Sequence, residues 1–350
     1  MSRNTIRTWA YRIGAYRIAR PLLVLGVGAW TVGCSSLLQA AETGEAQALS
    51  LRGNEAALAQ DFAAAATWWR KAAAAGHAPA ANSLGVMYQN GGEGVPPDFA
   101  QALYWYRLAA EAGDLNAMYN LGYMYDNALG VPARDPGEAA RWYRLAAERG
   151  EVKGQVGLGL LLGNGDLGAP DFAGALDWLG RAAAQGSAKG RTALGAMYEE
   201  GLGVAPDYRR SFDLYRQAAE QGYAKGRFNL GLAYDLARGV ARDPVEAIRW
   251  YRLAAEQGEP KSAFNLAIML QTGDGVAADP TEAARWYRLA ADKGEAKAAF
   301  NLGILHLDGD GEGVAADRTE ALHWLKRAAA TLPPGPQRDD AAALVEDLSR

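Results

Sequence analysis

The three histidines, His77, His306 and His323, are the first residues to test for acid–base or metal chemistry. They lie too far apart along the chain for a zinc-site spacing, and no serine and carboxylate accompany them in the pattern of a catalytic triad. His306 occupies a position that is tyrosine in several similar stretches of the chain, so we interpret it as a core residue. We therefore expect no catalytic residue, no enzyme activity and no cofactor.

One acidic loop has the beginning of a calcium-site spacing. Asp308, Asp310 and Glu312 alternate with glycine, which places oxygen ligands at positions 1, 3 and 5 of a calcium-binding loop. The acid required at position 12 is replaced by Thr319, and Glu320 comes one residue late. These three acids are therefore a weak metal candidate, and the alternative is a repeat loop that has been lengthened by two residues.

Cys34 is the single cysteine, which excludes a disulfide framework and a cysteine-based metal cage. Residues 1–33 contain five arginines and no acid, and they end in an apolar run from Pro21 to Val32. This order of charges and apolar residues is typical of a signal peptide for export. The residues Thr31-Val32-Gly33-Cys34 resemble the lipobox of bacterial lipoproteins, in which the cysteine becomes the lipidated N-terminus.

Three outcomes of this leader remain open. If Cys34 is lipidated, residues 34–43 form a tether and the chain contacts the membrane through its lipid anchor only. Ser35 after the cysteine then favours the periplasmic face of the outer membrane. The alternatives are cleavage after Ala40, which gives a soluble periplasmic or secreted protein, and an uncut anchor. All three export the chain.

The charge of the chain excludes a nucleic-acid partner. The net charge is −4 for all 350 residues, and residues 34–350 carry 31 Lys and Arg against 40 Asp and Glu, a net charge of −9. Binding to nucleic acid requires a basic surface. We therefore expect partners of another kind.

The elements that must position any binding residue form a tandem repeat. The segment AARWYRLAA occurs twice without change, at 139–147 and 283–291. A glycine closes the same helical pattern every 36 or 37 residues, at Gly76, Gly113, Gly150, Gly186, Gly222, Gly258 and Gly294. Repeats of this length indicate a solenoid, in which each unit buries its apolar face against its neighbours.

Each repeat reads as two helices. The first carries a small residue, Leu-Gly and an aromatic residue at helical spacing, and a Gly-Val loop follows it. The second begins at an aspartate that we interpret as an N-cap, at Asp98, Asp135, Asp171, Asp207, Asp243, Asp279 and Asp317. Three copies read Asp-Pro-x-Glu, which predicts a capping box. The tryptophans that recur in this helix are interpreted as core.

The pattern of Leu-Gly-x-x-Tyr, Gly-Val-x-x-Asp and Trp-Tyr-Arg-x-Ala-Ala-x-x-Gly resembles the Sel-one-like repeat (SLR) family, a relative of the tetratricopeptide repeat. The resemblance implies an all-α, right-handed α/α superhelical solenoid that serves as a non-enzymatic scaffold or adaptor. Its exported bacterial members act in envelope assembly, polysaccharide export, signalling or host interaction. A cysteine-rich branch is linked to β-lactam hydrolysis, but its paired cysteines are absent here.

The expected domain organisation follows from the repeat. Residues 1–33 are the signal peptide, 34–43 the tether, 44–332 the solenoid, and 333–350 a proline-rich stop with a terminal capping helix. Counting helix pairs gives about eight repeats, at 44–76, 77–113, 114–150, 151–186, 187–222, 223–258, 259–294 and 295–332.

Residues that recur on the first helix form the candidate partner-binding groove. They share fixed offsets from Leu-Gly, and they are Lys153, Lys189, Lys225, Lys261, Lys297, Asn120, Asn229, Asn265, Asn301, Phe228, Phe264 and Phe300. Lysine supplies charge, asparagine hydrogen bonds and phenylalanine apolar contact for an extended acidic ligand. The predicted partners are proteins of the cell envelope, or alternatively acidic polysaccharide or peptidoglycan fragments. In the competing interpretation, Phe and Asn contact neighbouring helices and Lys is only solvated.

Overall fold

Every element of the chain that the structure describes is an α-helix. The computed structural model describes residues 33–309 and 313–350. It divides into two compact halves, Met1–Trp178 and Leu179–Arg350, and each is treated by itself below. The described helices are α2 (Gly33–Leu58), α3 (Phe62–Ala74), α4 (Ala78–Asn90), α5 (Phe99–Glu111), α6 (Leu115–Asp126), α7 (Pro136–Glu148), α8 (Val152–Asn164), α9 (Phe172–Ala184), α10 (Ala188–Glu200), α11 (Tyr208–Glu220), α12 (Ala224–Asp235), α13 (Pro244–Ala255), α14 (Pro260–Thr272), α15 (Pro280–Asp292), α16 (Ala296–Asp308), α17 (Arg318–Thr331) and α18 (Pro336–Ser349).

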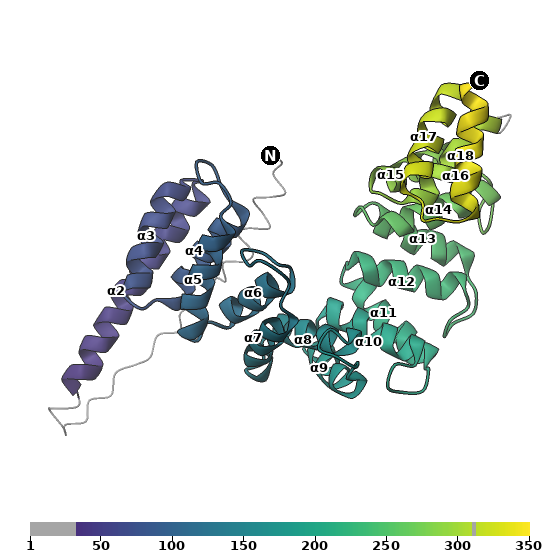
Figure 1. Cartoon of the computed structure of the whole chain (residues 1–350). Helices are drawn as coiled ribbons and strands as arrows, with labels where there is room; N and C mark the ends of the chain where they lie inside the picture. The colour runs from purple at the N-terminus through teal and green to yellow at the C-terminus, as the bar shows by residue number, and fades with distance from the viewer. Residues whose placement is uncertain (1–32, 310–312) are drawn as a thin grey trace. The chain divides into compact units, whose positions relative to one another are not determined.

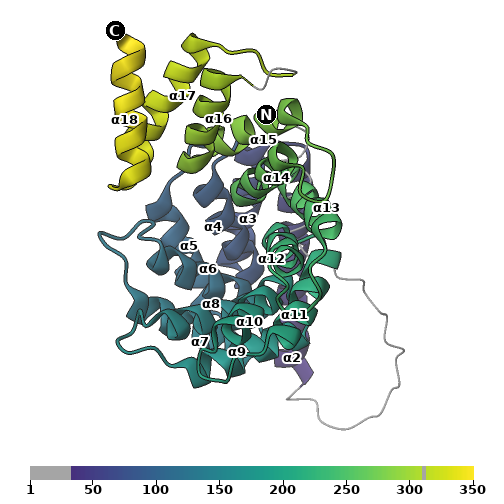
Figure 2. The ribbon, with the colours of Figure 1, turned by 90° about the vertical axis from the view of Figure 1, so that its right-hand side faces the viewer.

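Successive helices form hairpins, and the even-numbered member of each hairpin is the first helix of a repeat (Figures 1 and 2). Eight such pairs run from α2 to α17, which confirms the all-α solenoid with its eight repeats. Within the halves, α4 contacts α6, α6 contacts α8 and α10 contacts α12. In these pairs, the first helices of successive repeats therefore adjoin one another. Residues 34–43, the predicted tether, lie in the first part of the helix α2.

The predicted aspartate caps are confirmed at all seven positions. In α13, for example, the Asp243 carboxylate accepts a hydrogen bond from the backbone N–H of Glu246 at 3.1 Å. The predicted capping box is wrong, because the backbone N–H of Asp243 already donates to the carbonyl oxygen of Tyr234 in the preceding helix. The Glu246 side chain instead accepts from Trp250 Nε1 at 3.0 Å. The capping aspartate therefore also joins the two helices of the repeat through its backbone N–H.

The glycine at the end of each second helix has a backbone conformation that other residues rarely adopt. From Gly76 to Gly294, the seven recurrent glycines have φ between 83° and 95°. This left-handed conformation stops the helix within one residue and turns the chain toward the next first helix. It explains why glycine recurs at this position of the sequence.

The recurrent tryptophans belong to the core as predicted, with Trp142 and Trp324 buried and the others packed against it, but in most repeats the most deeply buried ring is the adjacent tyrosine. Tyr106, Tyr215, Tyr251 and Tyr287 are almost completely buried, whereas Trp250 and the equivalent rings of α5, α9 and α15 keep part of their surface exposed. The tyrosine ring fits against the glycine of the Leu-Gly pair in the first helix. A Cβ added to Gly231 would lie 2.7 Å from Cδ1 of Tyr251, which is closer than atoms can approach without a shift.

The C-terminal end of the array is closed by α18, as the sequence predicts. This helix contacts α17, and Ala341 is fully buried between them. Leu344, Val345 and Leu348 of α18 cover the apolar core of the last repeats. Arg318 of α17 donates to the carbonyl oxygen of Leu348 at 2.9 Å, which satisfies a backbone acceptor at the end of α18.

Replacing Tyr251 by alanine should lower the free energy of unfolding by about 3–5 kcal/mol, because it empties the centre of a closely packed repeat. Replacing Tyr104, whose side chain is 59% exposed, should change it by less than about 0.5 kcal/mol. Urea unfolding followed by circular dichroism measures both. Equal losses for the two variants would show that the tyrosine position does not carry the core.

Candidate functional site

The five predicted lysines recur at one structural position. Lys153, Lys189, Lys225, Lys261 and Lys297 are each the second residue of a first helix, from α8 to α16, and all five are exposed. Lys225, Lys261 and Lys297 form no ion pair with any residue that the structure describes. A helix N-terminus carries partial positive charge, so a lysine in the first turn is electrostatically unfavourable. We call these five residues the lysine row.

Three asparagines of the predicted groove, Asn120, Asn265 and Asn301, contact neighbouring helices. Asn120 of α6 donates to Oδ1 of Asn82 in α4 at 3.0 Å. Asn301 of α16 donates to the hydroxyl of Tyr287 in α15 at 3.2 Å, and Asn265 bonds the hydroxyl of Tyr251 in the same way. These amides join one repeat to the next. Their first role is therefore structural, as the competing interpretation held.

The phenylalanines of the predicted groove are half-buried against the core tyrosines. The rings of Phe264 and Tyr287 have centroids 6.1 Å apart, and those of Phe228 and Tyr251 are 6.2 Å apart. Phe300 packs on the same core cluster. These contacts leave only part of each ring exposed to a partner.

Each core tyrosine ends in a hydroxyl that bonds an acid or amide of the first helix in its own repeat. Tyr106 donates to Gln89 at 2.7 Å, Tyr215 to Glu199 at 2.8 Å and Tyr287 to Gln271 at 2.8 Å. Burial raises the pKa of the Tyr215 hydroxyl well above its ordinary value, and the Glu199 carboxylate raises it further. The hydroxyl therefore stays protonated and acts as a donor.

Two arginines link carboxylates of adjacent repeats. Arg134 contacts Asp126 at 2.7 Å and Asp166 at 2.8 Å, and its hydrogen bond lowers the pKa of Asp166. Arg242 makes the equivalent contacts with Asp235 and Asp274. These side chains are partly exposed, so each pair contributes only about 0.2–1 kcal/mol. They occupy acids that would otherwise repel an acidic partner.

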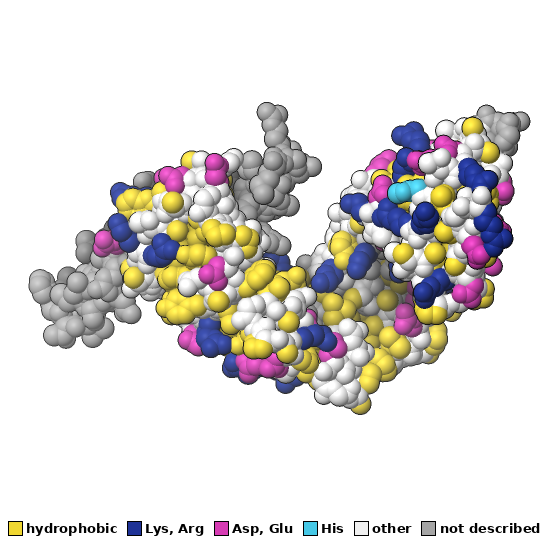
Figure 3. All heavy atoms as spheres, turned by 45° about the horizontal axis from the view of Figure 1, so that its top comes forward, with side chains coloured by type: hydrophobic (Ala, Val, Ile, Leu, Met, Phe, Trp, Pro, Cys, Tyr) yellow, Lys and Arg dark blue, Asp and Glu magenta, His cyan; other side chains and the backbone are white. Residues whose placement is uncertain are grey.

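Basic and acidic side chains are interspersed on the surface of both halves. Figure 3 shows lysine and arginine side chains next to acidic and apolar ones, without a continuous basic area on the face that it presents. This distribution agrees with the acidic net charge of the sequence. Electrostatic binding of an acidic partner must therefore depend on individual lysine or arginine side chains that have no carboxylate partner.

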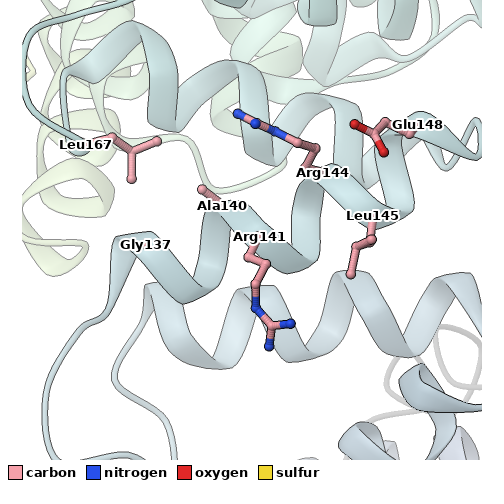
Figure 4. A pocket seen from close by; sticks show the side chains of 7 residues that line it. All are labelled: Gly137, Ala140, Arg141, Arg144, Leu145, Glu148 and Leu167. Atoms are coloured by element: carbon pink, nitrogen blue, oxygen red, sulfur yellow. The ribbon is translucent and has the colours of Figure 1, made fainter.

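Two cavities lie at equivalent places beside the two copies of AARWYRLAA. The first has a volume of about 370 Å³ and lies between α7 and Leu167 of the next loop (Figure 4). The second, of about 610 Å³, lies beside α15. Ala140, Arg141 and Arg144 line the first, and Ala284, Arg285 and Arg288 line the second. The sequence analysis did not identify these arginines, because it treated the second helix only as core.

The histidines do not assemble a catalytic or metal site. His77 caps α4 by accepting from the N–H of Ala80 at 3.2 Å, and burial lowers its pKa. His323 is exposed. His306 is half-buried and faces the cavity beside α15, where neither ring nitrogen has a partner among the described residues.

The acidic loop and the leader fall largely outside the described residues. Asp308 is exposed at the end of α16, but Asp310 and Glu312 lie outside the description, so the calcium prediction stays open. Within the described residues, no three metal-ligating side chains come together. Cys34 falls within α2, and residues 1–32 are not described, so lipidation stays a prediction. None of the described helices has the length and apolar character needed to span a bilayer.

Comparison with known proteins gives one consistent result. The Sel1 repeat family model matches eight consecutive segments, at 48–77, 78–114, 115–151, 152–187, 188–223, 224–259, 260–295 and 296–330. A protective antigen of uropathogenic Escherichia coli with an SLR fold is 34% identical, with a TM-score of 0.65 over 90% of this chain and 71% of the antigen. A Sel1 repeat protein of Oxalobacter formigenes is 26% identical, with a TM-score of 0.68 over 94% of this chain and 98% of its own. A comparison with curated proteins found no match.

Asparagine and lysine on one helix should respond differently to substitution. Asn301→Ala should lower the free energy of unfolding by about 1 kcal/mol, because it removes a hydrogen bond between repeats. Lys297→Ala should leave it unchanged within about 0.5 kcal/mol. Urea titration of the two variants tests the difference, and an Asn301→Ala variant as stable as the wild type would contradict the structural role.

Proposed function

Because the chain belongs to the Sel1 repeat family, whose members generally mediate protein–protein interactions, we propose that it is a non-enzymatic scaffold for protein partners in the bacterial cell envelope. Members of this family typically act without catalysis. The envelope location is supported by the leader, in which five arginines and an apolar run precede Cys34. In this proposal the lipid on Cys34 attaches the protein to the membrane, and the solenoid binds its partners.

The lysine row is the observation that carries this proposal. A solenoid that needed only stability would place acids in the first turn of each helix, where they interact favourably with the helix dipole. Five successive first helices instead carry an exposed lysine there. At Lys225, Lys261 and Lys297 no described carboxylate neutralises the charge. Cations that oppose helix stability and remain unpaired are available to an acidic segment of a partner.

Side chains cap the N-termini of α8, α10 and α14, whereas α12 and α16 have no side-chain cap from the residues that the structure describes. The Glu259 carboxylate accepts from the backbone N–H of Ser262, and the Glu151 carboxylate from that of Gly154. Both carboxylates accept from backbone N–H groups of the first helical turn and form no ion pair with any described lysine side chain. The partner's carboxylates therefore do not compete with these caps.

An acidic polysaccharide is the second candidate, because lysines that recur once in each of five repeats complement a polymer that carries many carboxylates. The two candidates differ in what they require. A protein partner uses additional apolar contacts and resists competition by a uronate polymer, whereas a glycan is displaced by such a polymer completely.

The charge-reversed variant Lys225→Glu, Lys261→Glu, Lys297→Glu should bind its envelope partner at least tenfold more weakly, which corresponds to about 1.4 kcal/mol or more. Its helicity and stability should not fall, since glutamate in the first turn is favoured by the dipole. A photo-crosslinking residue at Gln257, near Lys261, reports the contact in intact envelopes, and mass spectrometry identifies the product. The same probe at Tyr208, at the start of a second helix, is the control.

A matched variant shows whether binding depends on the position of the lysines or only on the net charge of the protein. Arg209→Glu, Arg285→Glu, Lys326→Glu changes the charge by the same amount on exposed positions of second helices, and it should retain the crosslink. Loss of the crosslink in both variants, or in neither, would refute the lysine row as the binding surface. Displacement by polygalacturonate together with no protein crosslink would favour the polysaccharide instead.

A further inference from the structure

In the C-terminal half, an arginine in one second helix is neutralised by a glutamate in the next. Arg252 of α13 contacts the Glu282 carboxylate of α15, and its hydrogen bond lowers the pKa of Glu282. Arg288 of α15 donates from Nη2 to Oε2 of Glu320 in α17 at 2.8 Å. In these two repeats the guanidinium binds a carboxylate that the following repeat supplies. At the same position, Arg216 pairs with Asp213 of its own helix and Arg107 donates to the hydroxyl of Tyr125.

Arg144 of α7 has the same position in its own repeat but lacks that carboxylate. Arg252 and Glu282 are separated by 30 residues, and the residue at that distance after Arg144 is Gly174, in the first turn of α9. Arg144 is exposed and makes no hydrogen bond or ion pair with any described residue. A glycine has thus replaced the side chain that would have neutralised Arg144.

The other charged residues around Arg144 do not take the place of the missing glutamate. In Figure 4 the Arg144 side chain extends toward Leu167 and away from Glu148. Arg141 points to the opposite side of α7, where its guanidinium binds Glu138 through two hydrogen bonds of 2.8 and 3.0 Å. Arg144 is therefore the available cation of this cavity.

The walls of the cavity define the shape of a suitable ligand. The volume is about 370 Å³, and Ala140, Leu145 and Leu167 give it an apolar lining beside the Arg144 guanidinium. A carboxylate on a short aliphatic stem, next to an apolar side chain, complements both features. Arginine binds such a carboxylate with two parallel hydrogen bonds, which a lysine does not offer.

We propose that Arg144 binds a glutamate or aspartate side chain in an acidic, partly apolar peptide segment of a partner protein, at the position that the glutamate of the following repeat fills elsewhere in the chain. The proposal rests on the scaffold function proposed above and assigns it a second, separate contact. The lysine row lies on first helices, whereas Arg144 lies on the second helix of its repeat.

Binding of a designed peptide to the full-length chain tests the site without knowledge of the natural partner. The probe is fluorescein-labelled Leu-Glu-Leu-Glu-Leu with blocked ends, and its control has glutamine in place of both glutamates. Fluorescence anisotropy gives the affinity, and the side-chain Nε–Hε signals of ¹⁵N-labelled arginine locate the contact. We expect the glutamate peptide to shift the Arg144 signal and to bind at least tenfold more tightly than the glutamine peptide.

Two variants remove the site in different ways. Arg144→Gln removes the cation, and Gly174→Glu supplies the missing carboxylate from within the chain, so each should weaken the glutamate peptide at least tenfold. The added side chain displaces the Asp171 carboxylate, and Asp279 shows that a capping aspartate accommodates glutamate at this position. Ala173→Glu is the matched control, because a side chain one residue earlier points about 100° away around the helix. It should change the affinity less than twofold.

Several results would overturn the proposal. These are equal affinity for the glutamine peptide, full binding by Arg144→Gln or Gly174→Glu, or a loss in Ala173→Glu as large as in Gly174→Glu. If Gly174→Glu fails to fold by circular dichroism, Arg144→Gln decides alone. If Lys225→Glu, Lys261→Glu, Lys297→Glu weakens the peptide as much as Arg144→Gln, the peptide senses only overall charge. The Arg144 site then fails, while the scaffold proposal remains to be judged by its own crosslink.

Discussion

The close approach of a large side chain of the second helix to a glycine of the first is the contact that organises most of the repeats, and in four of them this side chain is a tyrosine. A Cβ added to Gly85 would come within 2.5 Å of the ring of Tyr106, and a Cβ added to Gly122 within 2.6 Å of that of Tyr143. Glycine inside a helix costs about 1 kcal/mol relative to alanine. Burial of a large side chain contributes about 1.5–3 kcal/mol, so the exchange favours the folded repeat. The same ring then carries a hydroxyl to the surface of the first helices, where it meets an acid or amide of its own repeat and, in places, an asparagine of the next.

This arrangement distinguishes the side chains that hold neighbouring helices together from the charged side chains that have no partner among the described residues. The tyrosines, the asparagines and the paired arginines each satisfy a neighbour, and exposed ion pairs of this kind are individually weak. Leu179 in the fourth repeat and Leu325 in the last replace the tyrosine and have no hydroxyl, and the first repeat has Trp69 there. The boundary between the two compact halves falls at Leu179. Departures of this sort, and not the consensus residues, distinguish one repeat from another.

The local features of the fold were predictable from the sequence, and the contacts between helices were not. Aspartate caps, terminal glycines and the period of 36 or 37 residues depend on neighbouring positions of the chain, so pattern alone located them. The prediction that the tryptophans belong to the core was correct, but it did not single out the adjacent tyrosine, because the sequence alone does not show which of two neighbouring rings is buried more deeply. The candidate groove combined lysines, asparagines and phenylalanines by their shared offset, but offset does not show that Asn301 faces Tyr287. The signal for Arg144 was present in the sequence, as the glycine at 174 where the last three repeats have Glu246, Glu282 and Glu320.

The duplicated segment shows why a repeat cannot be interpreted in isolation. AARWYRLAA is identical at 139–147 and 283–291, so Arg144 and Arg288 have the same neighbours within their own helix. Arg288 is nevertheless paired with Glu320, whereas Arg144 has no described partner. The difference arises in the following helix, about 30 residues away, because a solenoid brings each repeat against the next. Whether a charged side chain in such a protein is paired therefore depends on two adjacent repeats. Arg144 is unpaired among the described residues because the following repeat has glycine at 174 where the glutamate would stand.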